Sequence, residues 1–209
     1  MHIPDGFLSP QTCVASYGVA LPFLYRGIKK VLREESLAKL AALSALSFLA
    51  MMINIPIPGG TSGHALGTSL LAVVFGPWEA ISSLSVVLAI QAVLFGDGGI
   101  TTYGANLITM GIVPAFVGFG VWKLFGRWRY AGYFLSGYLS LVSSALAASL
   151  ILGIQPLFFS HGGEPLYFPY GLKTTLAAMG VPSLIFFGPL EGIFNLAVLS
   201  YLMKDEKGN

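Results

Sequence analysis

The sequence carries little charge. Of its 209 residues only 10% are Asp, Glu, Lys or Arg, whereas an average soluble domain has roughly 25%. No charged residue interrupts the stretches 40–78, 80–96, 98–122 and 130–163, and 55% of the chain is hydrophobic. About 20 apolar residues suffice to cross a bilayer. The composition therefore predicts a membrane protein with several crossings and excludes a soluble domain.

Other features are scarce or missing, and each absence narrows the class of protein. The single Cys13 cannot form an internal disulfide and argues against a sulfur-ligated metal site. The N-terminus MHIPDGFLSP lacks the pattern of a cleaved signal peptide, so we expect Met1 to remain. No G-x-x-x-x-G-K-[ST] motif occurs, so ATP hydrolysis by a phosphate loop is excluded. A net charge of +2 is too small to suggest nucleic acid as a partner.

The apolar runs between polar or Gly/Pro breaks predict an all-α, polytopic fold in a single domain that spans 1–209. The expected helices lie near 9–32, 37–55, 64–76, 78–95, 105–123, 131–154 and 171–203. Basic residues gather in three places, at 26–39, at 123–129 and at 204–207. Because Lys and Arg accumulate on the cytoplasmic side, we expect an extracytoplasmic N-terminus and a cytoplasmic C-terminus, as seven crossings require.

The third expected segment, 64–76, is short for a crossing. Its 13 residues would extend roughly 20 Å at 1.5 Å per residue, against a hydrocarbon core of about 30 Å. Non-helical backbone at membrane depth has to be buried in protein or line a cavity. We therefore expect the preceding loop, NIPIPGGTSGH, to pack inward.

The expected topology places most of the unusual polar sequence on the outer face, and His2 is its most informative residue. A histidine at position 2 offers three nitrogens to one cation: the Met1 amine, its own backbone amide once deprotonated, and its imidazole. His64 is the candidate for a fourth. Four nitrogens in a plane suit Ni(II) or Cu(II), whereas Zn(II) prefers a tetrahedron. The alternative is that His2 is a frayed terminal residue and His64 an interfacial hydrogen-bonding group.

Polar residues near these histidines are candidates for supporting roles. Asn54, Thr61 and Ser62 are positioned to donate hydrogen bonds that orient an imidazole. The loop GDGGITTYGAN contains Asp97 and Asn106, which we expect to lock the loop, although Asp97 is also placed to attract a dication.

The sequence resembles the CbiM/NikM family, the substrate-capture components of energy-coupling factor (ECF) transporters for cobalt and nickel. The motifs that carry the resemblance are MHIPDGFLSP, NIPIPGGTSGHALG, FGPWEA and IQAVLFGDGGITTYGAN, in this order. The resemblance implies an inserted N-terminal tail and metal binding by Met1, His2 and His64. Some relatives carry a histidine before the pair Glu191 and Gly192, where this chain reads PSLIFFGPLEG. Glu191 is either a coupling or structural residue inside the membrane or a boundary residue, and His161 is an exposed or entry-path residue.

The resemblance also implies partners and a location. The chain would sit in the cytoplasmic membrane of a prokaryote and carry Ni(II), with Co(II) as the alternative, and no organic cofactor. A transmembrane coupling protein and cytoplasmic ATPases would drive release inward, and the need for a small accessory membrane subunit stays open. The competing functions are an energy-independent metal facilitator or channel and, less in keeping with the sequence, an intramembrane metalloenzyme. The latter would need a general base beside the metal, and neither histidine has a neighbouring Glu.

Overall fold

The computed structural model describes residues 2–57 and 61–203, and most of them are helical. The principal helices are α1 (Pro10–Val31), α2 (Leu37–Met52), α3 (Thr68–Phe75), α4 (Pro77–Ile90), α6 (Val113–Phe125), α7 (Arg129–Gly153) and α10 (Gly188–Leu202). Shorter helices are α5 (Tyr103–Asn106), α8 (Gln155–Phe158) and α9 (Leu172–Thr175). Four π-helical turns join them, η1 (Gln91–Phe95), η2 (Leu107–Ile112), η3 (Leu176–Gly180) and η4 (Ser183–Phe187).

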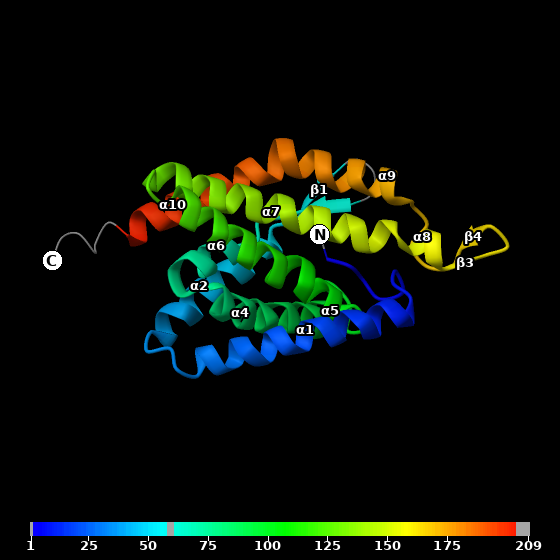
Figure 1. Cartoon of the computed structure of the whole chain (residues 1–209), viewed down its shortest axis with the longest axis horizontal. Coiled ribbons are helices and arrows are strands. Elements are labelled where there is room, and N and C mark those ends of the chain that lie inside the picture. Colours follow the sequence, from blue (N-terminus) through cyan, green and yellow to red (C-terminus); the bar gives the residue numbers. More distant parts are fainter. Residues whose placement is uncertain (1, 58–60, 204–209) are drawn as a thin grey trace.

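The helices form an elongated bundle (Figure 1). Helix α7 packs against α6 on one side and α10 on the other, while α1 packs against α4. Helix α3 lies between these pairs, in contact with α4, α6 and α7. The core is apolar, and Leu70, Leu84, Met110 and Leu141 are completely buried. The mostly helical prediction is therefore confirmed, with two short β-ribbons that it did not include.

Four helical runs are long and apolar enough to cross a membrane: Pro77–Phe95, Tyr103–Phe125, Arg129–Phe158 and Leu172–Leu202. Helix α2 is a shorter apolar helix. Helix α1 has 22 residues but carries Lys29 and Lys30 in its last turn. Its start follows from local chemistry, because Ser9 accepts a hydrogen bond from the Thr12 N–H and Pro10 occupies the first turn. The seven crossings and their orientation stay predictions.

The expected segment 64–76 differs from what the structure shows. Helix α3 begins at Thr68 and ends at Phe75, so it has 8 residues and is roughly 12 Å long at 1.5 Å per residue. Gly67 before the helix has φ of +69° and Gly76 after it has φ of +114°. These angles are not helical, so the helix ends at both glycines, and residues with a side chain rarely adopt them. Residues 64–67 therefore form an irregular segment, called the His64 turn below, and not a helix.

The loop before α3 is only partly inward. Strands β1 (Ile55–Ile57) and β2 (Thr61–Gly63) pair antiparallel, with Ile55 opposite Gly63. Asn54 and Pro56 are exposed, and burial begins at Gly63 and His64. The expectation that the whole loop packs inward is therefore wrong for its first strand. The second ribbon, β3 (Ser160–His161) with β4 (Glu164–Pro165), projects from one end of the molecule (Figure 1).

Helix α2 packs in two ways. Leu40, Leu43, Ser47 and Met51 are buried against the bundle. Another face, which includes Ala41, Ser44 and Ala45, lines an open apolar groove of about 730 Å³ between α1, α2 and α4. Of the small side chains of this helix, Ser47 thus serves internal packing, while Ala41, Ser44 and Ala45 line a surface that is open to packing by another apolar element.

Candidate metal centre

The first residues of the chain run into the bundle between α1 and α7 (Figure 1). Ile3 is completely buried. Its backbone N–H donates to Asn106 Oδ1 at 2.8 Å, and its carbonyl accepts from Asn106 Nδ2 at 2.9 Å and from Thr102 Oγ1 at 2.6 Å. Asn106 therefore binds both the N–H and the carbonyl of Ile3, as a neighbouring β-strand would. These bonds hold the adjacent His2 at its position inside the bundle.

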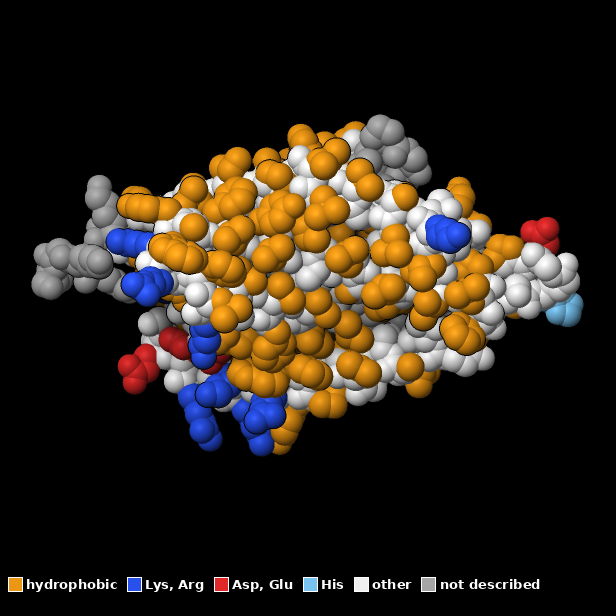
Figure 2. Space-filling model, turned by 45° about the horizontal axis from the view of Figure 1, so that its top comes forward, with side chains coloured by type: hydrophobic (Ala, Val, Ile, Leu, Met, Phe, Trp, Pro, Cys, Tyr) orange, Lys and Arg blue, Asp and Glu red, His pale blue; other side chains and the backbone are white. Residues whose placement is uncertain are grey.

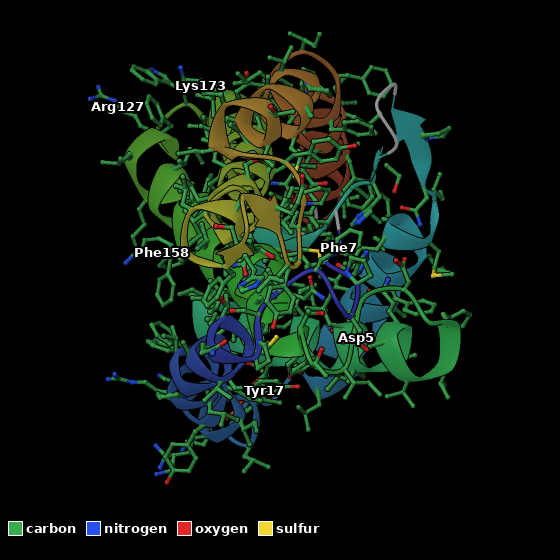
Figure 3. The ribbon with its side chains drawn as sticks, turned by 90° about the vertical axis from the view of Figure 1, so that its right-hand side faces the viewer. Asp5, Phe7, Tyr17, Arg127, Phe158 and Lys173 are labelled. Carbon is green, nitrogen blue, oxygen red and sulfur yellow. The ribbon has the colours of Figure 1, made fainter. Side chains whose placement is uncertain are left out.

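Asp5 anchors the tail a second time. Its carboxylate accepts from the backbone N–H groups of Ile100 and Thr101 at 3.2 and 2.8 Å and from the Thr101 hydroxyl at 2.5 Å. The Thr101 hydroxyl also lowers the pKa of Asp5 below its ordinary value. Gly99 permits this approach, because a Cβ there would overlap the Asp5 carboxylate. Viewed from the end that carries β3 and β4, Asp5 and Phe7 lie near the middle of the molecule (Figure 3).

The His2 ring has a polar neighbour at each of its nitrogens. Its side chain is 5% exposed, and Nε2 lies 3.1 Å from Gln91 Oε1 in η1. In the tautomer that donates from Nε2 to this amide oxygen, Nδ1 keeps its lone pair. Nδ1 lies 3.2 Å from Asp97 Oδ1 but makes no hydrogen bond within the described part of the chain. Burial lowers the pKa of His2 from 6.5 to about 4, so the ring is neutral near pH 7.

His64 lies beside His2. It is completely buried, and the two ring centroids are 4.9 Å apart with an interplanar angle of 31°. Its Nδ1 lies 3.0 Å from the Ala65 carbonyl oxygen, which accepts the ring proton. The lone pair is therefore on Nε2. Two neutral imidazoles side by side, each with a hydrogen-bond partner at one ring nitrogen, are typical of metal-ligating pairs.

The predicted supporting residues fall into two groups. Asn54 Nδ2 donates to Asp97 Oδ2 at 3.4 Å, and the Ser62 hydroxyl donates to Asn54 Oδ1 at 3.4 Å. These contacts link the β-ribbon to the carboxylate that faces His2. Asn106 holds the tail, as described above. The side chain of Thr61 lies outside the described residues, as does Met1 with its amine.

The two remaining candidates lie in different surroundings. Glu191 is completely buried, and its carboxylate accepts from the backbone N–H groups of Leu66 and Gly67, both at 2.8 Å. It therefore lies inside the protein, against the His64 turn. His161 is exposed on the projecting β3–β4 ribbon.

Sequence reasoning missed Gln91. Its signal was a polar side chain inside the apolar run 80–96, and the structure buries it completely, with Oε1 on His2. It opens η1, and single π-helical turns inside α-helices are frequent at functional sites.

The donor set is poor in acidic and sulfur groups. Among the described residues, no group of three or more His, Cys, Asp or Glu side chains is placed to hold a metal ion. Any cation at His2 and His64 would therefore need donors beyond side chains of these types, such as backbone or terminal nitrogens. This arrangement suits a borderline metal that accepts nitrogen ligands.

Comparisons with known proteins agree with this chemistry. The family described as "Cobalt uptake substrate-specific transmembrane region" (CbiM) matches residues 2–207. The chain is 41% identical to the probable fused nickel transport protein LarMN of Lactiplantibacillus plantarum, over 98% of the chain and 65% of that protein. It therefore spans just under two thirds of that relative's length. It is also 31% identical to the cobalt transport protein CbiM of Streptomyces coelicolor, over 100% of the chain and 90% of the relative.

A solved structure has the same fold. The crystal structure of a truncated transition metal transporter superposes with a TM-score of 0.93 at 42% identity, covering 98% of this chain and 99% of that one. The family match and the apolar helices together define a transmembrane protein, and its relatives include proteins named for nickel and for cobalt transport. The chain belongs to the CbiM family.

Proposed function

We propose that the chain captures Ni(II), with Co(II) as the alternative, through a site that includes His2 and His64. The observation that carries the proposal is the pair of imidazoles 4.9 Å apart, each with one nitrogen in a hydrogen bond. Nδ1 of His2 faces the Asp97 carboxylate at 3.2 Å. A cation bound at Nδ1 would also be attracted by this carboxylate, so this corner of the site favours a bound cation.

The proposed donors are the Met1 amine, the backbone nitrogen and Nδ1 of His2, and Nε2 of His64. The first three form two chelate rings from adjacent positions of one chain end, and His64 closes the plane. A square of four nitrogens favours Ni(II) over Co(II). Nickel transport is named in one relative and cobalt transport in another, which agrees with a site of this kind serving either metal.

We further propose that the chain is the substrate-specific component of an ECF-type importer in a prokaryotic cytoplasmic membrane. A transmembrane coupling protein and cytoplasmic ATPases would then supply the energy. A small accessory subunit is a further candidate partner, since the nickel relative is named a fused protein and is longer than this chain. The metal is substrate here, so no catalytic residue is assigned.

Nickel uptake by cells that lack their own nickel transporters tests this proposal. Cells that express the chain with its coupling protein and ATPases should accumulate nickel, and an ATPase-inactive set should not. The purified chain alone in liposomes should bind nickel without letting it cross. Equilibration of nickel across those liposomes would instead identify an energy-independent facilitator and contradict the proposal.

A further inference from the structure

Glu191 is a buried carboxylate with backbone partners. It lies in the first turn of α10 and is 0% exposed. Both oxygens accept backbone hydrogen bonds at 2.8 Å, from Leu66 and from Gly67. Within the described ranges no Lys, Arg or His lies at salt-bridge distance from it. A buried charge is costly unless compensated, so these two N–H groups and the N-terminal end of α3 are what stabilise it.

The same face of this helical run also contacts the other end of the His64 turn. Phe187 precedes Glu191 by four residues, which places both on one side of a helix. Gly63 lies so close to the Phe187 ring that a Cβ at residue 63 would overlap it. Phe187 therefore packs against Gly63, the residue before His64. Glu191 binds the backbone N–H groups of Leu66 and Gly67, which follow His64.

The turn itself has little freedom to adopt another shape. Gly67 has a left-handed φ of +69°, and a Cβ there would overlap the Ser47 side chain of α2. Glu191 binds the last two backbone amides before α3 begins, those of Leu66 and Gly67. A change in this carboxylate would be transmitted directly to the backbone that carries the His64 imidazole.

We propose that Glu191 is a positioning residue for the metal site: its carboxylate fixes the turn 63–67 so that His64 Nε2 points to the cation held by His2. This inference rests on the proposed function. In this proposal α10 supplies no metal ligand but controls the geometry of the site.

The Glu191→Gln variant isolates this role. Glutamine keeps the shape but offers one acceptor oxygen, so its NH₂ group would face a backbone N–H of the turn. The turn should shift, and nickel affinity should fall about 10- to 100-fold, as it does when the groups that orient metal ligands are removed. The absorption bands of bound nickel should shift as well, because the His64 donor is no longer in the same place.

Glu79→Gln is the matched control. Glu79 is also buried in the first turn of a helix, α4, but it precedes Gln91 by 12 positions on one continuous helical run, roughly 18 Å at 1.5 Å per residue. Both variants should lower the thermal midpoint, whereas only E191Q should change nickel affinity and the nickel spectrum.

The experiment measures nickel binding, nickel absorption and thermal unfolding of the purified full chain and both variants. An E191Q protein with wild-type affinity and spectrum would overturn the inference, provided that the wild type binds nickel. If the wild type does not bind nickel, the proposed function itself fails. Should E191Q not fold, Glu191→Asp is used, whose shorter side chain cannot reach both amides. It should show the same loss of affinity, and wild-type binding by E191D would overturn the inference.

Discussion

At the residue scale, the three histidines differ in burial: two side chains are buried and the third is exposed. His2 and His64 are buried side by side, each with a hydrogen-bond partner at one ring nitrogen, and His161 is exposed on a projecting ribbon. Because a ligand contributes more than the groups that orient it, His64→Ala should weaken nickel binding by more than about 100-fold. His161→Ala, its matched control, should bind as the wild type does. Equilibrium dialysis measures both, and equal losses would remove His64 from the site.

The lowered pKa of His2 predicts how stability changes with pH. The unfolded ring takes up a proton near pH 6.5, but the folded ring does so only near pH 4. Between these values the unfolded chain binds more protons, so acidification destabilises the metal-free protein, by up to about 3 kcal/mol from this ring. The loss should be complete below about pH 4 and absent above pH 6.5.

Thermal midpoints of the metal-free protein between pH 7.5 and 4.5 test this linkage. The His2→Asn variant has no ring to titrate, so its midpoint should depend less on pH than that of the wild type. Equal pH dependence in the two proteins would show that His2 does not contribute.

At the scale of elements, the inserted tail depends on the loop before α5. A methyl group on residue 99 would overlap the Asp5 carboxylate, so Gly99→Ala should displace the tail and His2 with it. We expect nickel affinity to fall at least about tenfold. Gly120→Ala in α6, where a Cβ would meet no atom within 4 Å, is the control and should bind normally. Nickel titration of both variants measures the effect, and normal binding by the Gly99 variant would contradict the anchoring role of Asp5.

Sequence patterns predicted the helical class and the pairing of His2 with His64, but not the contacts that hold them. Hydrophobic runs reflect burial over many residues and are therefore visible in one sequence. Gln91 acts through one hydrogen bond to a residue 89 positions away, and Glu191 through two, to residues 125 and 124 positions away, and no local pattern exists for such contacts. The start of α3 was misplaced because Ala65 and Leu66 continue the apolar run of the helix, while Gly67 adopts a left-handed φ that only the fold reveals.

At the scale of the whole molecule, the basic residues distinguish one end from the other. Most of the Lys and Arg side chains in view gather at one end of the molecule, and apolar side chains cover the middle (Figure 2). The N-terminal tail, the loop 96–102 and the β3–β4 ribbon belong to the other part of the bundle (Figure 1). By the rule that basic residues face the cytoplasm, we propose that the histidine site opens toward the outside, as capture of an external cation requires.

The central claim is that the chain's own beginning binds the metal, and nickel stoichiometry with and without an N-terminal extension tests it most directly. The purified chain with a free Met1 amine should bind one nickel ion per molecule. A chain with a few residues added before Met1 should keep its helical content and lose nickel, because the amine is then a peptide bond and the tail no longer fits. Stoichiometric nickel in the extended protein would contradict the proposed site.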